Sequence, residues 1–196
     1  MKDHLLAPLR LTFLPDETCE RLGVTSINTE RIDYALGFVH GRLLDVGCGR
    51  NHLVNRYPGF GVGVDVFDWS AGALILRDTS RLPFLDRSFD TVTVLAALNH
   101  IPNRVDVLRE AHRVLRDDGR LVMTMIPPGL SALGHKVLWW HGEDWARGMG
   151  EGEVYGFTSR QIATLAETAQ FELLEHRRFL YRLNHLYVFK KRGAPR

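Results

Sequence analysis

The sequence has little cysteine, no strong excess of one charge and no long apolar run. It contains two cysteines and balances 25 basic against 23 acidic side chains over 196 residues. Two cysteines exclude a disulfide framework, and a formal charge of +2 gives no electrostatic case for a polyanionic partner. No stretch approaches the roughly 20 apolar residues that a membrane span needs, and the N-terminus is too charged for a signal peptide. We therefore expect a cytoplasmic protein with no nucleic-acid partner and no membrane span.

Strand-like and helix-like segments alternate along the chain. The early strand patterns are apolar on both faces, which is typical of parallel strands covered by helices. The last two strand patterns are joined by only a few residues and must pair antiparallel. The sequence predicts an α/β fold with an open, doubly wound, mostly parallel sheet and an antiparallel last strand. The predicted strands are 42–46, 60–67, 73–78, 89–98, 120–126, 171–179 and 185–191, and the predicted helices are 28–39, 51–57, 103–116 and 158–169.

Helix boundaries are predicted from capping residues. Asn28 or Thr29 is expected to begin the first helix and Asn103 the third, while Thr158 opens a capping-box pattern. The run 117–119, Asp-Asp-Gly, is expected to end the third helix before the next strand. No repeat or low-complexity linker interrupts the chain, so we expect one domain over 1–196, with a helical N-terminal segment at 1–40.

The stretch LLDVGCGRNHLV, residues 43–54, places two glycines between a strand and a helix. A dinucleotide fingerprint would need glycine at the position of His52, and a free acid at Asp45 would repel a pyrophosphate. Asp45 instead favours a cationic or zwitterionic ligand such as an amino acid. Asp65 ends the second strand, where a carboxylate can accept hydrogen bonds from two ribose hydroxyls. A ribose and an amino acid with no phosphate between them indicate S-adenosylmethionine.

Four motifs in order, LLDVGCG, GVD, RDTSRLPFLDRSFDTV and EAHRVLRDDGRLVMT, resemble class I S-adenosylmethionine-dependent methyltransferases. The resemblance is to the type 11 or ubiquinone-methyltransferase-like branch and covers about residues 30–190. It implies a Rossmann-like, seven-stranded sheet and S-adenosyl-L-methionine as cofactor. It also implies that the turn holds the methionine portion, Asp65 the ribose, and the residues before LPF the adenine. The implied cofactor-binding residues are Asp45, Gly47, Cys48, Gly49, Asp65, Val66, Asp78, Thr79 and Ala96.

Two departures from the family pattern bear on the fold. Asn51 stands where the family usually has a third glycine, and asparagine tolerates positive φ better than most residues. Asp65 and Asp78 are too close in sequence for the usual helix between them, because a parallel crossover needs a dozen residues or more. We therefore expect the helix after the second strand to be shortened or absent, with Phe67 or Trp69 filling its place.

Other residues are candidates for the acceptor side. His100, in LNHIP after the fourth strand, is a candidate general base, although it could merely close the turn. The irregular, aromatic stretch 127–157 is expected to form a lid over the acceptor, or else to cover a sheet edge or a dimer contact. The spacing of histidines there matches no firm metal-ligand pattern, so no metal is expected. The candidate acceptor-contacting residues are Trp139, Trp140, His141 and Tyr155.

The sequence thus predicts a methyltransferase acting by in-line displacement on a small-molecule or lipid-like acceptor, with a homodimer left open. Three rivals are weighed against it. A nucleic-acid methyltransferase would carry a basic face and an Asn-Pro-Pro-aromatic motif after the fourth strand, where AALNHIP stands. A nicotinamide dehydrogenase would need a glycine at position 52, where this sequence has histidine. A catalytically silent binding or scaffold protein of the same fold is the alternative that the shortened helix favours.

Overall fold

The computed structural model describes residues 16–129 and 150–193. Helices and strands alternate through most of the chain, as the sequence patterns predict. The helices are α3 (Asp16–Leu22), α4 (Ile27–Leu36), α5 (His52–Arg56), the 3-10 helix η1 (Leu98–His100), α6 (Arg104–Val114) and α9 (Ser159–Thr168). The strands are β1 (Leu43–Val46), β2 (Gly61–Asp65), β3 (Leu74–Ile75), β4 (Phe89–Leu95), β5 (Leu115–Met125), β6 (Phe171–Phe179) and β7 (Asn184–Lys191).

The seven strands form one sheet in the order β3-β2-β1-β4-β5-β7-β6. Strands β1 to β5 pair in parallel, and β7 lies antiparallel between β5 and β6. The predicted fold class, including the antiparallel last strand, is confirmed. The order reverses between β1 and β4, and ligands of open α/β sheets bind beyond the carboxyl ends of the strands at such a point.

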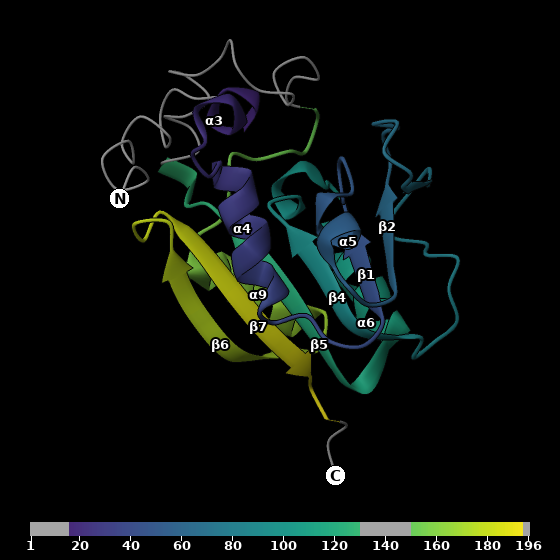
Figure 1. Cartoon of the computed structure of the whole chain (residues 1–196). Coiled ribbons are helices and arrows are strands. Elements are labelled where there is room, and N and C mark those ends of the chain that lie inside the picture. Colours follow the sequence, from purple (N-terminus) through teal and green to yellow (C-terminus); the bar gives the residue numbers. More distant parts are fainter. Residues whose placement is uncertain (1–15, 130–149, 194–196) are drawn as a thin grey trace.

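Helices cover both faces of the sheet, with α4 and α5 on one face and α6 and α9 on the other (Figure 1). The side chains of β1 alternate between these layers, as the pleat of a strand requires. Leu43 packs with the α4–α5 layer beside Leu53, and Leu44 packs in the larger core that α6 and α9 cover. Because Asp45 follows Leu44, its side chain lies on the α5 face at the carboxyl edge.

Helix α4 begins earlier than the sequence predicts. It starts at Ile27, and the Ser26 hydroxyl caps it by accepting a hydrogen bond from the Thr29 amide at 3.0 Å. Asn103 precedes α6 as predicted, but its side chain makes no capping bond there. The side-chain amide of Asn103 donates a hydrogen bond to Asp78 instead, and this contact between distant parts of the chain cannot be predicted from local sequence. The capping box of Thr158 and Gln161 is confirmed.

The prediction that residues 117–119 separate α6 from the next strand is wrong. Strand β5 begins at Leu115, directly after the helix, and includes the run 117–119. The ladder with β4 shifts its register here, since Phe89 pairs with Leu115 while Thr91 pairs with Arg120. The extra residues are therefore absorbed as an irregularity at the start of the strand.

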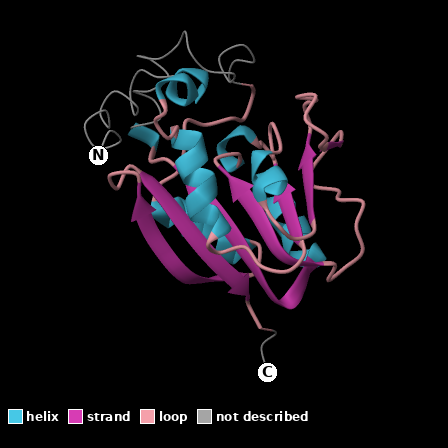
Figure 2. Cartoon of the chain, in the orientation of Figure 1, coloured by secondary structure: helices cyan, strands magenta, loops and turns pink. Residues whose placement is uncertain are grey.

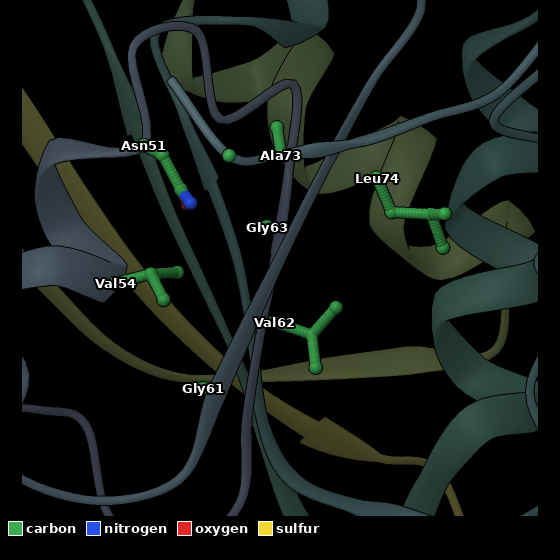
Figure 3. Close-up of a pocket in the computed structure, with 8 residues that line it drawn as sticks. Asn51, Val54, Gly61, Val62, Gly63, Ala73 and Leu74 are labelled. Carbon is green, nitrogen blue, oxygen red and sulfur yellow. The ribbon is translucent and has the colours of Figure 1, made fainter. Parts of the chain in front are cut away.

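The helix after β2 is absent, as the short spacing predicts. Residues 66–73 form a loop leading to β3, which has only two residues (Figure 2). An open groove of about 490 Å³ lies beside α5. Phe67 and Trp69 contact each other, with ring centroids 4.7 Å apart, and neither lines this groove. The lining residues are Asn51, Val54, Gly61, Val62, Gly63, Gly72, Ala73 and Leu74 (Figure 3).

Candidate cofactor and acceptor site

The turn after β1 depends on three left-handed residues. Gly47, Gly49 and Asn51 have φ values of +70°, +53° and +59°. A Cβ at Gly47 would lie 2.5 Å from the Cβ of Ala97, so glycine is required by both conformation and space. A Cβ at Gly49 would meet nothing within 4 Å, so this glycine leaves open space for a ligand. Asn51 adopts the positive φ expected of a residue that replaces glycine.

Hydrogen bonds from the turn connect it to β2. The amides of Gly47 and Cys48 donate to the Val64 carbonyl, and the Gly49 amide donates to Asp65 Oδ2 at 2.8 Å. The other carboxylate oxygen of Asp65 accepts from the Phe67 amide at 3.0 Å. An ionised carboxylate offers about four lone-pair positions, so Asp65 retains the capacity to accept two ribose hydroxyls.

Asp45 is the most deeply buried acid of the site, with 3% of its surface exposed. Burial raises its pKa to about 7, and repulsion from Asp65 adds to this shift. A hydrogen bond of 2.6 Å from the Thr93 hydroxyl to Oδ1 lowers the pKa of Asp45, because it stabilises the carboxylate. Two acids buried close together attract a cation, since a positive group relieves both desolvation and mutual repulsion.

Thr93 is a site residue that sequence reasoning missed. It pairs with Asp45 across β1 and β4, so the two side chains share one face of the sheet. The signal was available in the alternation of Thr91 and Thr93 with the apolar Val92 and Val94. Cys48, which belongs to the predicted set, has its pKa raised by burial and by both nearby acids. Its thiol therefore stays protonated and is no nucleophile.

The residues predicted to contact adenine lie on the next loop. Asp78 accepts hydrogen bonds from the amide and hydroxyl of Ser80, both at 2.8 Å, and from the side chain of Asn103 at 3.0 Å. These bonds lower its pKa. Asp78 thus connects the loop after β3 to the start of α6, while Thr79 beside it is buried. An adenine contact from this pair stays a prediction.

The remaining residues predicted to bind the cofactor lie at the ends of strands. Val66 follows β2 and is half-exposed, as an apolar wall for a ligand would be. Ala96 follows β4 with a φ of +52°, and its amide donates to the Thr124 carbonyl. The strained backbone turns the chain into η1 directly beside the glycine turn, where Ala97 contacts Gly47.

His100 ends η1 and contacts a residue that the sequence did not indicate. Its Nδ1 lies 3.0 Å from Glu153 Oε2. The two side chains are 14% and 4% exposed. No sequence signal could have found this pair, because the residues lie 53 positions apart and only the fold brings them together.

Part of the expected acceptor lid is described. Residues 150–157 lie against the turn between β4 and α6, where the Val154 amide donates to the Asn99 carbonyl at 3.0 Å. Arg104 donates to the Gly152 carbonyl at 2.6 Å. The Tyr155 side chain is largely exposed. The other predicted acceptor residues, Trp139, Trp140 and His141, lie outside the described part of the chain.

Fold and site together define a class of protein. A sheet of this order, with a glycine turn and an acid at the end of β2, is the architecture of class I methyltransferases. A family model described as "Methyltransferase domain" matches residues 44–123. This match covers 80 of the 196 residues and agrees with the type 11 methyltransferase family expected from the motifs, whose cofactor is S-adenosylmethionine.

Curated relatives are similar over part of their length. A demethylmenaquinone methyltransferase of Thermotoga maritima is 39% identical over 75 residues, covering 38% of this chain and 33% of the relative. A 27-O-demethylrifamycin SV methyltransferase of Amycolatopsis mediterranei is 30% identical, covering 62% of this chain and 54% of the relative. The chain thus spans about a third to a half of the length of these relatives.

Solved structures show the same fold. A possible histamine N-methyltransferase of Thermotoga maritima superposes with a TM-score of 0.62 at 16% identity, covering 83% of this chain and 88% of that one. A 1,6-didemethyltoxoflavin-N1-methyltransferase of Burkholderia thailandensis, solved with S-adenosylhomocysteine, has a TM-score of 0.60 at 16% identity. It covers 83% of this chain and 79% of that one.

Proposed function

We propose that this protein transfers a methyl group from S-adenosylmethionine to a small-molecule or lipid-like acceptor. The observation that carries the proposal is the pair of buried acids, Asp45 and Asp65, on either side of an open glycine turn. Such a pair suits a ligand with an ammonium group, a ribose and no phosphate. When bound, S-adenosylmethionine supplies a methyl group already activated on a sulfonium.

Each element of the turn has a distinct part in binding. Asp45 attracts the ammonium group, Gly49 lets the methionine portion approach the backbone, and Asp65 accepts the ribose hydroxyls. Asp65 is already oriented by the Gly49 and Phe67 amides, so little further ordering is needed when the ligand binds. Positioning the two reactants in line then lowers the barrier without a covalent step on the protein.

The acceptor class rests on the relatives. Demethylmenaquinone and ubiquinone biosynthesis methyltransferases, together with the rifamycin enzyme, support a ring-bearing small molecule or quinone-like lipid. No described helix is long and apolar enough to cross a membrane. A cytoplasmic location, a homodimer and the absence of a nucleic-acid partner stay predictions.

The alternative is a catalytically silent binding or scaffold protein. The absent helix between β2 and β3 favours it, because the sheet there stays uncovered beside the cofactor turn. A silent protein would retain the cofactor pocket but methylate no acceptor.

Titration calorimetry followed by a turnover screen separates these functions. We expect S-adenosylmethionine and S-adenosylhomocysteine to bind and NAD not to bind. Release of S-adenosylhomocysteine is then measured with reduced demethylmenaquinone, 27-O-demethylrifamycin SV and simple catechols as acceptors. Binding without turnover on any acceptor would support the scaffold function, and binding of NAD alone would contradict the proposed pocket.

A further inference from the structure

We propose that Glu153 is a positioning residue that holds His100 as the general base, and that the acceptor group is a hydroxyl. This inference rests on the proposed methyl transfer and assigns its acceptor atom. It starts from a contact between the turn after β4 and the described end of the acceptor-side segment.

The location of His100 relates it to the cofactor turn. Ala97, the residue before η1, lies against Gly47, and the His100 amide donates to the Ala97 carbonyl at 2.9 Å. His100 is thus one 3-10 turn from the glycine turn, at the carboxyl ends of β1 and β4. That is the edge at which the strand order reverses and ligands bind.

The backbone that carries Glu153 is held by contacts on both sides of this residue. Before it, the Gly152 carbonyl accepts a hydrogen bond from Arg104, and Gly152 itself has a φ of +81° beside Pro102. After it, the Val154 amide donates to the Asn99 carbonyl. The backbone on both sides of Glu153 is therefore held by contacts that do not involve the His100 ring.

The proposal requires one charge state of Glu153 and one tautomer of His100. When Glu153 is ionised, its carboxylate accepts hydrogen bonds only, and Nδ1 then carries the proton that it donates to Glu153. The lone pair of the neutral ring then lies on Nε2, the nitrogen that can accept a proton. Because the Glu153 side chain is 4% exposed, its negative charge is poorly screened and stabilises the imidazolium that forms.

A base positioned in this way suits a hydroxyl acceptor. An amine attacks with its own lone pair, whereas an alcohol or phenol becomes a strong nucleophile only as it loses its proton. In the step, the acceptor proton moves to Nε2 while the oxygen forms the new bond to the methyl carbon. The carbon–sulfur bond breaks with its electron pair on sulfur, and the imidazolium later releases its proton to water.

Glu153→Gln removes the charge and retains a hydrogen-bond acceptor, and Arg104→Ala is the matched control. Arg104 fastens the same segment through the Gly152 carbonyl without touching the His100 ring contact. Imidazole nitrogen NMR of the full chain with S-adenosylhomocysteine is expected to show the His100 proton on Nδ1. We expect the ring nitrogen signals at fixed pH to change in the glutamine variant, which loses the charged acceptor, and to stay as in the wild type in the control.

Kinetics on the best acceptor from the screen provide the second readout. In Glu153→Gln, kcat should fall about 10- to 100-fold with little change in KM, and the acidic limb of its pH profile should move to lower pH. Arg104→Ala should leave that limb in place, and His100→Gln should abolish it. The proposal is overturned if the proton sits on Nε2, if the limb is unmoved, or if the methylated product carries the group on nitrogen or carbon.

Failure of the proposed function gives a different pattern. It would appear as loss of cofactor binding or turnover in the wild type. The NMR measurement still decides the role of Glu153 in that case, since it needs no acceptor.

Discussion

We expect the charge state of Asp45 to make cofactor affinity depend on pH. Its pKa of about 7 lies above the ordinary value for an aspartate, because the side chain is buried beside Asp65. We expect affinity for S-adenosylmethionine to rise from pH 6 to pH 8 as this carboxyl ionises. Calorimetry on Asp45→Asn provides the baseline, since the ligand's own amine titrates equally in both proteins. Equal pH dependence in the two proteins would remove Asp45 from the ammonium site.

Asp45→Asn should stabilise the ligand-free protein at high pH, although it weakens cofactor binding. The ligand-free native state holds the Asp45 proton up to about pH 7, whereas an unfolded aspartate releases it near pH 4. Asp45 therefore costs the native state stability as pH rises through this window. Asp45→Asn should raise the melting temperature at pH 8 while weakening cofactor binding, and calorimetric scans at pH 5 and pH 8 measure the difference.

Asp65 should contribute to both the ribose site and the glycine turn. Asp65→Asn is expected to weaken S-adenosylmethionine binding by roughly 1–3 kcal/mol, because hydrogen bonds to a charged acceptor are lost. Asp65→Ala should also lower the melting temperature, since the Gly49 amide loses its partner. Titration and thermal scans separate the two effects. Unchanged affinity in both variants would show that Asp65 lies outside the site.

At the scale of the element, the strand–turn–helix unit β1–α5 contains two glycines with different tasks. Gly47→Ala should destabilise the fold by about 1–3 kcal/mol, because its Cβ would overlap Ala97 at positive φ. Gly49→Ala should cost less stability, since its Cβ meets open space, and should chiefly weaken cofactor binding. Denaturant unfolding and calorimetry test this contrast. Loss of stability without loss of binding in Gly49→Ala would place the ligand elsewhere.

Element boundaries show where local reasoning holds. The capping box at Thr158 was predictable because its partners lie within four residues of one another. The contact of Asn103 was not predictable, since its side-chain amide donates to Asp78 in a distant part of the chain and does not cap α6. The start of β5 was also missed, because a turn-like run can be absorbed by a shift in the ladder with β4.

At the scale of the whole molecule, alternating patterns and spacing were sufficient to predict the fold class. Parallel strands buried on both faces and a short antiparallel end follow from periodicity and connection length. The missing crossover helix follows from the short spacing between Asp65 and Asp78 compared with the pattern of the family that the motifs resemble. The sequence patterns did not predict the strand order β3-β2-β1-β4-β5-β7-β6 or the open groove beside α5, which the structure adds.

The sequence by itself determined the sheet, the glycine turn and the two acids that suit S-adenosylmethionine, because those signals are local in the chain. Only the tertiary structure decided how the site is supported. It placed Thr93 on Asp45 and Glu153 on His100, in pairs separated by 48 and 53 residues. Burial then raised the pKa of Asp45, a property that depends on everything packed around it. Contacts between distant residues and the desolvation they cause arise only when the chain is folded.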